Sequence, residues 1–405
     1  MLITFILSAL LLPACSDHER VHGNEDFQRP DSSISAGSDS DSDTDSDTDT
    51  DSYDPEVIDA VISHAAPEPA GCVRLDEEYG KYPELFAWSG TWFAFYAEGE
   101  YSTESTLELR RSDMDPVDFS EPVTLLYGAR HVDMIRDEDV FLVAAARMYY
   151  VVLLESTDGS EWIEHEDYVA PDEPTYSCEG FPPVKFSKSE ARSRYIAMGH
   201  DFNNGVFGCT DELYVARRSG DTWDVPEHIG DGDAVFAFER TERVMILSTF
   251  GVWFSTDSGG TFKEASGGDT TAAQIYGTGG TRTGDMIIIV QSYNYADTNH
   301  IAAIVSSDDG ATWPVRIILK KSKNNNFTPK IVSYDDTLAV AFVLNDAVHV
   351  MTSPDRGESW SESGVFNDVE ETGTVSRFSL AVSGDRIGIL LESEGIFFCN
   401  GRSSL

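Results

Sequence analysis

The chain has 405 residues, of which 41% are hydrophobic and 11% aromatic. It can therefore bury a large core, as two or three domains or as one larger β-structure. It carries 71 acidic and 28 basic residues, a formal net charge of −43. A surface of this charge repels a phosphate backbone, so we expect no nucleic-acid partner.

The first residues, MLITFILSALLLPAC, form one apolar run that ends at Cys15. The run has the length of a signal-peptide apolar region and is too short to span a bilayer. LPAC resembles the lipobox of bacterial lipoproteins, in which the cysteine is lipidated and becomes the mature N-terminus. This resemblance implies a signal peptide over 1–14 and lipidation of Cys15. Because Ser16 follows, it also implies an outer-membrane or cell-surface lipoprotein of a Gram-negative bacterium; a secreted protein is the alternative.

A polar segment over 15–71 follows, with SDSDSDTDSDTDTDS (38–52) at its centre. Alternating Asp with Ser or Thr provides no apolar face, and the like charges repel one another, so we predict a disordered acidic tether. A calcium loop requires glycine-enforced bends and a bidentate carboxylate at fixed spacing, which this run lacks. The tether would hold the folded part away from a membrane, which the protein contacts through its lipid anchor only.

From Cys72 onward, short apolar runs rich in β-branched and aromatic residues alternate with Gly, Asp and Asn turns. Examples are TWFAFYAEG, VFLVAAARM, RVMILSTF, MIIIVQSY, LAVAFVL and RIGILLES. Runs of this kind at regular spacing predict strands. No long stretch has helical periodicity, so the predicted fold class is all-β, with one folded domain over 72–405.

One motif recurs at the ends of predicted strands: STDSGGTF (255–262), SSDDGATW (306–313) and SPDRGESW (353–360). Weaker copies are STDGSEW (156–162), ARRSGDTW (216–223) and RSDMDPVDF (111–119). A recurring unit of about 40 to 60 residues indicates a repeat architecture. The Asp accepts backbone hydrogen bonds within a turn, Gly permits a positive φ, and the final aromatic can pack between sheets.

The motif resembles the Asp-box (BNR repeat) of sialidase-like β-propellers, where it joins the third and fourth strands of a four-stranded antiparallel blade. The resemblance implies that the box lies on the face away from the active site and that its residues are structural. These residues are Asp158, Asp257, Asp308 and Asp355, with the aromatics Trp162, Trp223, Phe262, Trp313 and Trp360.

Six box-bearing units precede a seventh set of strands, RFSLAVSG, RIGILLES and GIFFCNG. This set lacks a fourth strand, which CVRLDEE after Gly71 can supply. We therefore predict seven blades, with six as the alternative, in a ring closed by an N-terminal strand. If Cys15 is lipidated, four cysteines remain. The blade register pairs Cys72 with Cys399 and Cys178 with Cys209.

Ligands of propellers bind at the central funnel, on the face where the innermost strands begin. Candidate ligand-binding residues at or near the starts of inner strands, or on loops of that face, are Arg130, Arg147, Lys185, His200, Tyr293, Tyr295, Lys330 and Arg377. The two long loops are GHDFNNGVFGCTDE (199–212) and QSYNYADTNH (291–300). Converging arginines suit carboxylates, and aromatic and amide side chains suit sugar rings.

Sialidases use an Arg-Ile-Pro motif, which is absent; its nearest counterpart is YPELF (82–86), with Glu84 in place of arginine. Candidate catalytic residues are Glu84 and Asp201. The histidines lack metal-ligand spacing and no nucleotide fingerprint is present, so we expect no metal and no cofactor.

The predicted function is recognition, without catalysis, of a glycan or of a cell-surface or extracellular protein by a monomeric propeller. One alternative is an exo-acting, sialidase-like glycoside hydrolase with a divergent carboxylate pair. The other is an assembly scaffold.

Overall fold

The structure is a computed structural model. It describes residues 56–59, 62–64, 71–76, 80–99, 105–137, 139–147, 150–165, 169–170, 183–188, 194–203, 209–220, 222–240, 242–249, 251–264, 276–295, 298–310, 312–313, 315–323, 328–345, 347–366 and 375–402. The chain divides into the units Met1–Ser52 and Tyr53–Leu405, and every described residue lies in the second. The described residues form strands and turns without a helix, so the all-β prediction is confirmed.

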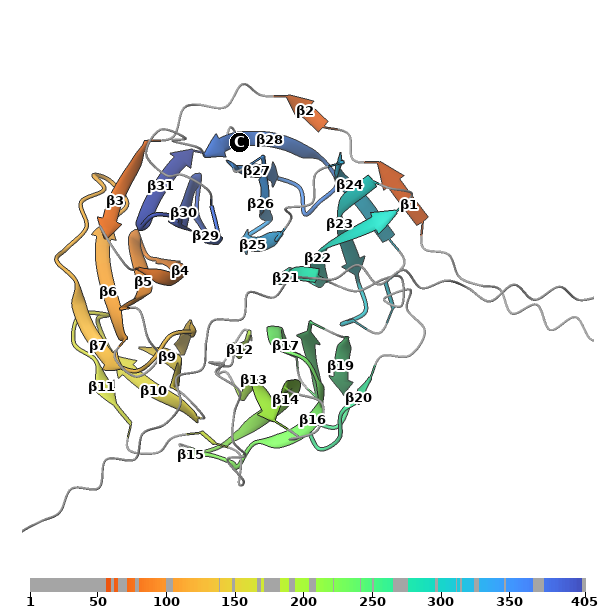
Figure 1. Ribbon diagram of the computed structural model, residues 1–405. Helices are drawn as coiled ribbons and strands as arrows, with labels where there is room; N and C mark the ends of the chain where they lie inside the picture. Colours follow the sequence, from red (N-terminus) through yellow and green to blue (C-terminus); the bar gives the residue numbers. More distant parts are fainter. Residues whose placement is uncertain are drawn as a thin grey trace, which may run out of the picture. The chain divides into compact units, whose positions relative to one another are not determined.

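Most strands pair antiparallel with their neighbours in sequence, and the resulting sheets are arranged around a common centre as in a β-propeller (Figure 1). In addition, Ser187 and Lys188 pair in parallel with Ala237 and Phe238, which joins two of these sheets. The first sheet consists of β4 (Lys81–Trp88), β5 (Thr91–Glu98), β6 (Thr106–Asp113) and β7 (Val123–Tyr127). The second consists of β8 (Val132–Asp137), β9 (Val140–Arg147), β10 (Tyr150–Ser156) and β11 (Ile163–Glu164). Next come β12 (Val184–Lys188), β13 (Tyr195–Asn203) and β14 (Cys209–Ser219), with β15 (Thr222–Trp223) and β16 (Glu227–Asp231) both on β14.

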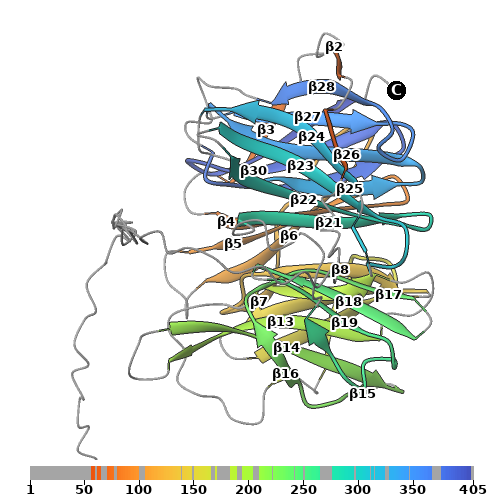
Figure 2. The same cartoon turned by 90° about the vertical axis from the view of Figure 1, so that its right-hand side faces the viewer.

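The remaining sheets complete the arrangement. They are β17 (Ala234–Arg240), β18 (Arg243–Ser248), β19 (Val252–Ser255) and β20 (Lys263–Glu264); β21 (Tyr276–Thr283), β22 (Met286–Tyr295), β23 (Thr298–Ser306) and β24 (Val315–Ser322); β25 (Lys330–Tyr334), β26 (Thr337–Leu344), β27 (Ala347–Ser353) and β28 (Trp360–Phe366). The last contains β29 (Arg377–Ser383), β30 (Arg386–Glu392), β31 (Ile396–Arg402) and β3 (Cys72–Asp76). Figure 2 shows from the side that the β21–β24 and β25–β28 sheets are neighbours.

The core lies between the faces of adjacent sheets. Hydrophobic clusters join the β4–β7 sheet to the β8–β11 sheet, that sheet to β12–β14, and β12–β14 to β17–β19. Further clusters join β17–β19 to β21–β24, β21–β24 to β25–β28, β25–β28 to β29–β31, and β29–β31 back to β4–β7. Because the second strand of each sheet is covered on both faces, its sequence is an almost continuous apolar run. β5 and β26 are the clearest examples.

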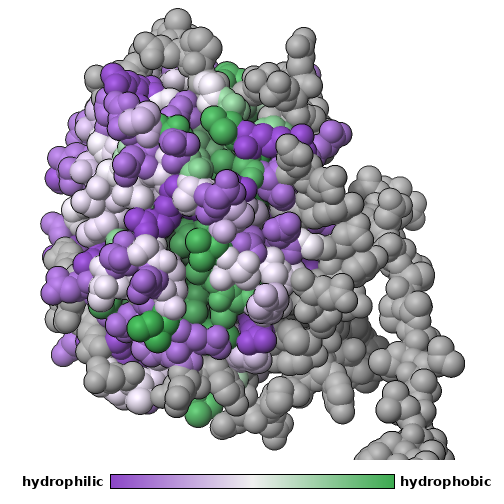
Figure 3. All heavy atoms as spheres, turned by 90° about the vertical axis from the view of Figure 1, so that its left-hand side faces the viewer, coloured by the Kyte–Doolittle hydropathy of each residue, from purple (hydrophilic) through white to green (hydrophobic). Residues whose placement is uncertain are grey.

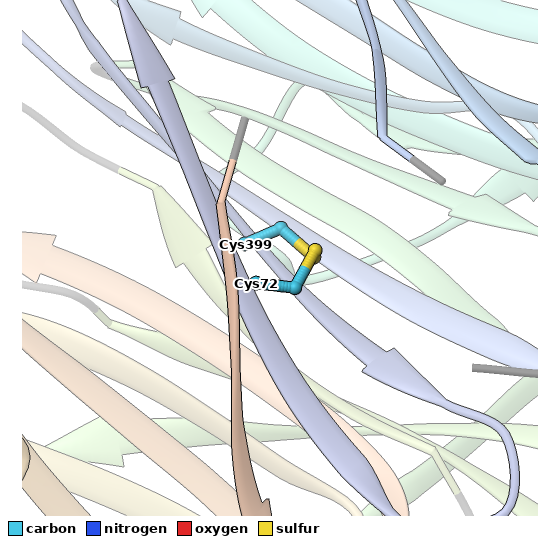
Figure 4. The surroundings of a disulfide bond; sticks show 2 residues. All are labelled: Cys72 and Cys399. Atoms are coloured by element: carbon cyan, nitrogen blue, oxygen red, sulfur yellow. A yellow bond between two sulfur atoms is a disulfide. The ribbon is translucent and has the colours of Figure 1, made fainter. Parts of the chain in front are cut away.

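The predicted pairing of the chain's N-terminal side with its last strand is confirmed. β3 runs antiparallel to β31, and Cys72 lies directly opposite Cys399 in this ladder. The two cysteines form a disulfide with their Cα atoms 4.1 Å apart (Figure 4). The other predicted pair, Cys178–Cys209, lies outside the described residues, since the structure does not describe Cys178.

Two short strands lie within the segment predicted to be a tether. β1 (Glu56–Asp59) pairs in parallel with β24, from Val315 to Ile318, and β2 (Ile62–His64) pairs in parallel with β28. An outermost strand exposes unpaired backbone N–H and C=O groups, and both short segments contain β-branched residues, which favour strands. We call β1 and β2 together the strap, because they lie along the outer edges of two consecutive sheets (Figure 1).

The outer strands β11 and β20 have only two residues each, and the longer outer strands β24 and β28 are paired with β1 and β2. Short edges limit pairing with other chains. Figure 3 shows one side of the molecule, where hydrophilic residues cover most of the surface and apolar residues form a band down its middle. Among the described residues, Ile163 on β11 and Tyr127 on β7 are the most exposed large apolar side chains, at 72% and 67%.

Candidate functional site

A cavity of about 280 Å³ opens where the innermost strands begin. We call it the upper cavity. Its walls come from six inner strands, β4, β8, β12, β17, β25 and β29, which contribute residues at or near their starts. The lining residues that carry chemistry are Tyr82, Glu84, His131, Lys185, Asp233, Thr249, Lys330, Ser376 and Arg377. Four of the predicted site residues, Glu84, Lys185, Lys330 and Arg377, therefore lie around one space.

Two lysines at the floor of this cavity differ in their partners. The Lys185 ammonium lies 3.9 Å from a Glu84 carboxylate oxygen, and Glu84 also accepts a hydrogen bond of 3.1 Å from Ser379. Lys330 has no ion pair or hydrogen bond within the part of the chain that the structure describes. Burial alone would lower the pKa of Lys185, but the carboxylates of Glu84 and Asp133 outweigh burial and raise it.

Lys330 shows the opposite behaviour. Burial lowers the pKa of its ammonium, the Glu84 carboxylate opposes this, and the neighbouring Lys185 lowers the pKa further. The net direction is downward, because the effect of burial is the largest of the three. A buried ammonium that forms no ion pair of its own is stabilised by an anion that enters the cavity.

Tyr82 is the contact point of two arginines at the cavity rim. The Arg130 Nη1 donates a hydrogen bond of 3.2 Å to the Tyr82 hydroxyl. The guanidinium carbons of Arg130 and Arg377 lie 5.2 and 4.5 Å from the centre of the Tyr82 ring. The structure thus brings Arg130 and Arg377 together, with a tyrosine between them.

Glu392 contacts both Tyr82 and Arg377 at this rim. Its carboxylate accepts a hydrogen bond of 2.8 Å from the Tyr82 backbone N–H and one of 3.0 Å from the Ser376 hydroxyl. It also forms an ion pair of 3.0 Å with Arg377, whose side chain is 50% exposed while that of Glu392 is only 8% exposed. One buried carboxylate therefore fixes both the backbone of Tyr82 and the direction of Arg377.

His131 lies against Tyr82, with ring centres 4.7 Å apart in an edge-on arrangement. Burial lowers the pKa of His131, and the positive charges of Lys185, Arg377, Lys330 and Arg130 lower it further, to about 3. The imidazole is therefore neutral at ordinary pH. Its two ring nitrogens have no hydrogen-bond partner among the described residues.

A second cavity, of about 390 Å³, continues along the inner strands. We call it the lower cavity. It shares Glu84, Lys185, Lys330 and Val235 with the upper cavity, so these residues form a waist between the two. Below the waist the walls are more aromatic, with Phe86, Trp88, Phe141, Phe186 and Phe236.

Other predicted ligand-binding residues are not brought to the axis. Arg147 ends β9 and lies over the ring of Tyr150 at 5.9 Å, and it does not line either axial cavity. Tyr293 contacts Arg316 and His300 on its own sheet. The side chains of His200, Asp201 and Tyr295 lie outside the described residues.

The long loops that were expected to carry these residues are instead largely strand. β13 extends to Asn203 and β14 begins at Cys209, so that these two residues are paired in the ladder. In the same way, β22 continues to Tyr295 and β23 begins at Thr298. Backbone pairing across each hairpin continues through polar residues because a ladder requires no apolar side chain.

The box motifs form turns between the third and fourth strands of their sheets. In the turn after β19, Ser255 and Thr261 donate hydrogen bonds of 2.6 and 2.8 Å to the Asp257 carboxylate. Asp158, Asp308 and Asp355 accept the same kinds of bonds in their turns. Since neighbouring strands alternate in direction, these turns lie at the opposite end of the sheets from the upper cavity.

These bonds favour ionised aspartates. Hydrogen bonds from Ser255 and Thr261 lower the pKa of Asp257 from 3.8 to about 2. The terminal aromatics pack beside the turns: Trp313 and Trp360 are buried, while Trp162, Trp223 and Phe262 are partly buried against hydrophobic clusters. The turn residues are thus engaged in local structure and not in the axial cavities.

Sequence reasoning did not identify Tyr82, His131 or Glu392. Tyr82 is the first residue of the segment YPELF, His131 directly follows Arg130, and Glu392 is the last but one residue of the predicted strand RIGILLES. Among the described residues, no three His, Cys, Asp or Glu side chains are grouped to hold a metal ion. None of the described segments forms a helix capable of crossing a membrane.

No protein-family model matches the chain, and no curated protein matches its sequence. Solved structures of similar architecture include an α-L-arabinanase of Penicillium chrysogenum in complex with arabinobiose, with a TM-score of 0.43, 11% identity, and coverage of 83% of this chain and 99% of that one. A six-bladed fucose-recognising lectin of Aleuria aurantia has a TM-score of 0.43 and 11% identity, with coverage of 80% and 92%. The NanB sialidase of Streptococcus pneumoniae has a TM-score of 0.42 and 10% identity, with coverage of 85% and 70%. At this level the likeness concerns general architecture and assigns no residue or activity.

Proposed function

We propose that the protein recognises an acidic glycan in the upper cavity. The observation that carries the proposal is Lys330, a cavity-lining ammonium without a counterion in the described part of the chain. Arg377 adds a half-exposed guanidinium at the rim, and Arg130 adds a second beside Tyr82. The chain has a net charge of −43, so the gathering of positive side chains around one cavity supports an anionic ligand there.

The chemistry of the cavity favours a carboxylate-bearing sugar over a protein face. Guanidinium groups match the planar carboxylate, while Thr249 and Ser376 can bond sugar hydroxyls. A concave space of about 280 Å³ admits one or two sugar units and no folded surface. Hydrolysis of the glycan is the second candidate, because Glu84 lines the same cavity.

The test is calorimetric titration of the full chain with a trigalacturonate and with a neutral trisaccharide. We expect binding of the acidic sugar only. Lys330→Met should weaken this binding about 10- to 100-fold, since a hydrogen bond to a charged group contributes roughly 1.5–3 kcal/mol. Lys263→Met is the matched control on the outer strand β20, where the lysine is exposed. Equal affinities for the two variants would show that the cavity is not the site.

We further propose that the sheets form seven blades in a closed ring and that the chain belongs to the Asp-box propellers. The continuous succession of hydrophobic clusters around the sheets supports the ring. The bonding within the four box turns supports the family.

We also propose export as a monomeric outer-membrane lipoprotein. The apolar run that ends at Cys15 supports this proposal, as does the Cys72–Cys399 disulfide, because disulfides persist in oxidising compartments. Mass spectrometry of the N-terminal peptide from cells should find a mature chain that begins at a lipidated Cys15. A mature chain that begins elsewhere would exclude the anchor.

A further inference from the structure

Tyr82 has a backbone conformation that is unusual for an aromatic residue. Its φ is 56°, in the left-handed region that residues other than glycine rarely adopt. Such strain persists where the surroundings enforce it, and it concentrates at functional sites. Here the hydrogen bond from the Tyr82 N–H to Glu392 enforces it. The result is a phenol held at the cavity rim against two arginines and a histidine.

The Tyr82 hydroxyl has the surroundings of a proton donor. Its oxygen already accepts a hydrogen bond from Arg130, and the Arg377 guanidinium lies 4.5 Å from the ring centre. Negative charge that develops on this oxygen during a reaction would lie beside the Arg130 guanidinium, with the Arg377 guanidinium over the ring. Prearranged charges of this kind stabilise a transition state without reorganisation.

His131 has the surroundings of a base that acts only when an anion is bound. Burial, together with the positive charges of Lys185, Arg377, Lys330 and Arg130, lowers the pKa of the imidazole and keeps it neutral. A bound carboxylate compensates these charges and thereby raises the proton affinity of the ring. Both ring nitrogens lack partners among the described residues, so one is available to a ligand.

We infer that the upper cavity cleaves an acidic glycan by β-elimination, with His131 as the base and Tyr82 as the acid. The inference rests on the proposed recognition of an acidic glycan and extends it to a reaction. The substrate class is a 4-linked uronate, whose carboxylate lies next to the carbon that loses its proton. Lys330 and Arg377 would hold that carboxylate.

The step balances without water or a redox partner. A His131 nitrogen takes the proton from C5 of the uronate, and the electrons of that C–H bond form a C4–C5 double bond. The C4–O bond breaks, its electron pair stays on the leaving oxygen, and the Tyr82 hydroxyl supplies the proton to that oxygen. The imidazolium then returns its proton to the adjacent Tyr82 phenolate, which restores both groups.

The experiment incubates the full chain with defined 4-linked oligouronates, such as hexagalacturonate and hexamannuronate, and weighs the fragments by mass spectrometry. Elimination yields two fragments whose masses sum to that of the parent, and one fragment absorbs in the ultraviolet through its conjugated double bond. Hydrolysis yields fragments that together exceed the parent by one water. We expect the first pattern.

Tyr82→Phe keeps the ring between the arginines and removes the transferable proton. We expect the cleavage rate to fall about 100- to 10,000-fold while the affinity for trigalacturonate changes less than about threefold. Tyr334→Phe is the matched control, because Tyr334 is 43% exposed and lies outside both cavities. His131→Asn is a second variant with the same expected loss, in case Tyr82→Phe alters the fold.

The outcomes separate the two proposals. Binding of the oligouronates without cleavage would overturn the elimination and leave recognition standing, as would cleavage that both variants retain. Fragments heavier by one water would overturn elimination in favour of hydrolysis. If the chain binds no acidic sugar and Lys330→Met has no effect, recognition itself fails.

Discussion

Removal of the Cys72–Cys399 disulfide should cost a large part of the stability of the domain. The two cysteines are 327 residues apart, and the chain-entropy model for a closed loop of this length gives about 6 kcal/mol at 25 °C. Measured effects are commonly smaller, so we expect a loss of about 3–6 kcal/mol in the free energy of unfolding. Cys399 is fully buried, and its replacement by alanine adds a small cavity cost.

The assay is urea denaturation of the Cys72→Ala/Cys399→Ala double variant beside the oxidised protein, followed by fluorescence. The reduced protein with native cysteines is the control, since it lacks the bridge and keeps the side chains. Because reduction also opens the predicted Cys178–Cys209 bridge, the reduced protein should lose at least as much stability as the double variant. A loss below about 1 kcal/mol in both would refute the reasoning. It would mean that residual pairing of β3 with β31 keeps the two ends of the unfolded chain together even without the disulfide.

Two further outcomes follow from local features. Tyr82→Gly should unfold at a higher urea concentration than Tyr82→Ala, by about 1 kcal/mol in free energy, because glycine adopts the φ of 56° without strain; equal stabilities would show that the backbone relaxes. The folded-state pKa of Asp257, about 2, lies below its ordinary value of 3.8, so its contribution to stability is present above pH 4 and is lost as the pH falls towards 2. The stability difference between the protein and Asp257→Ala should therefore shrink over that interval in thermal melts, and a constant difference would contradict the assigned cause.

Local features of the fold could be predicted from the sequence. The turn chemistry of Ser255, Asp257 and Thr261 lies within seven consecutive residues, so the motif is visible in the sequence and its hydrogen bonds follow from it. The second strands are visible because burial on both faces leaves an unbroken apolar run. The pairing of Cys72 with Cys399 was predictable because the last set of predicted strands lacked a fourth strand. The segment that begins at Cys72 could supply this strand beside the one that contains Cys399.

The site was predictable only in part. The charged residues at the inner-strand starts, such as Lys330 and Arg377, could be placed near the axis from the strand register alone. Tyr82 could not, because its role depends on a positive φ and on arginines 48 and 295 positions away in the chain. No local pattern signals these contacts. The strap was missed because its pairing depends on the free edges of β24 and β28.

The strap determines where mechanical load reaches the domain. Tension on the chain ahead of Glu56 acts first on the few hydrogen bonds between β1 and β24, and then on those between β2 and β28. Only after both have parted does the load arrive at β3 and the Cys72–Cys399 bridge, which cannot part without reduction. Under tension the strap therefore detaches first and lengthens the extended part of the chain. The disulfide bears the load only afterwards, so the strap can be lost without disruption of a sheet.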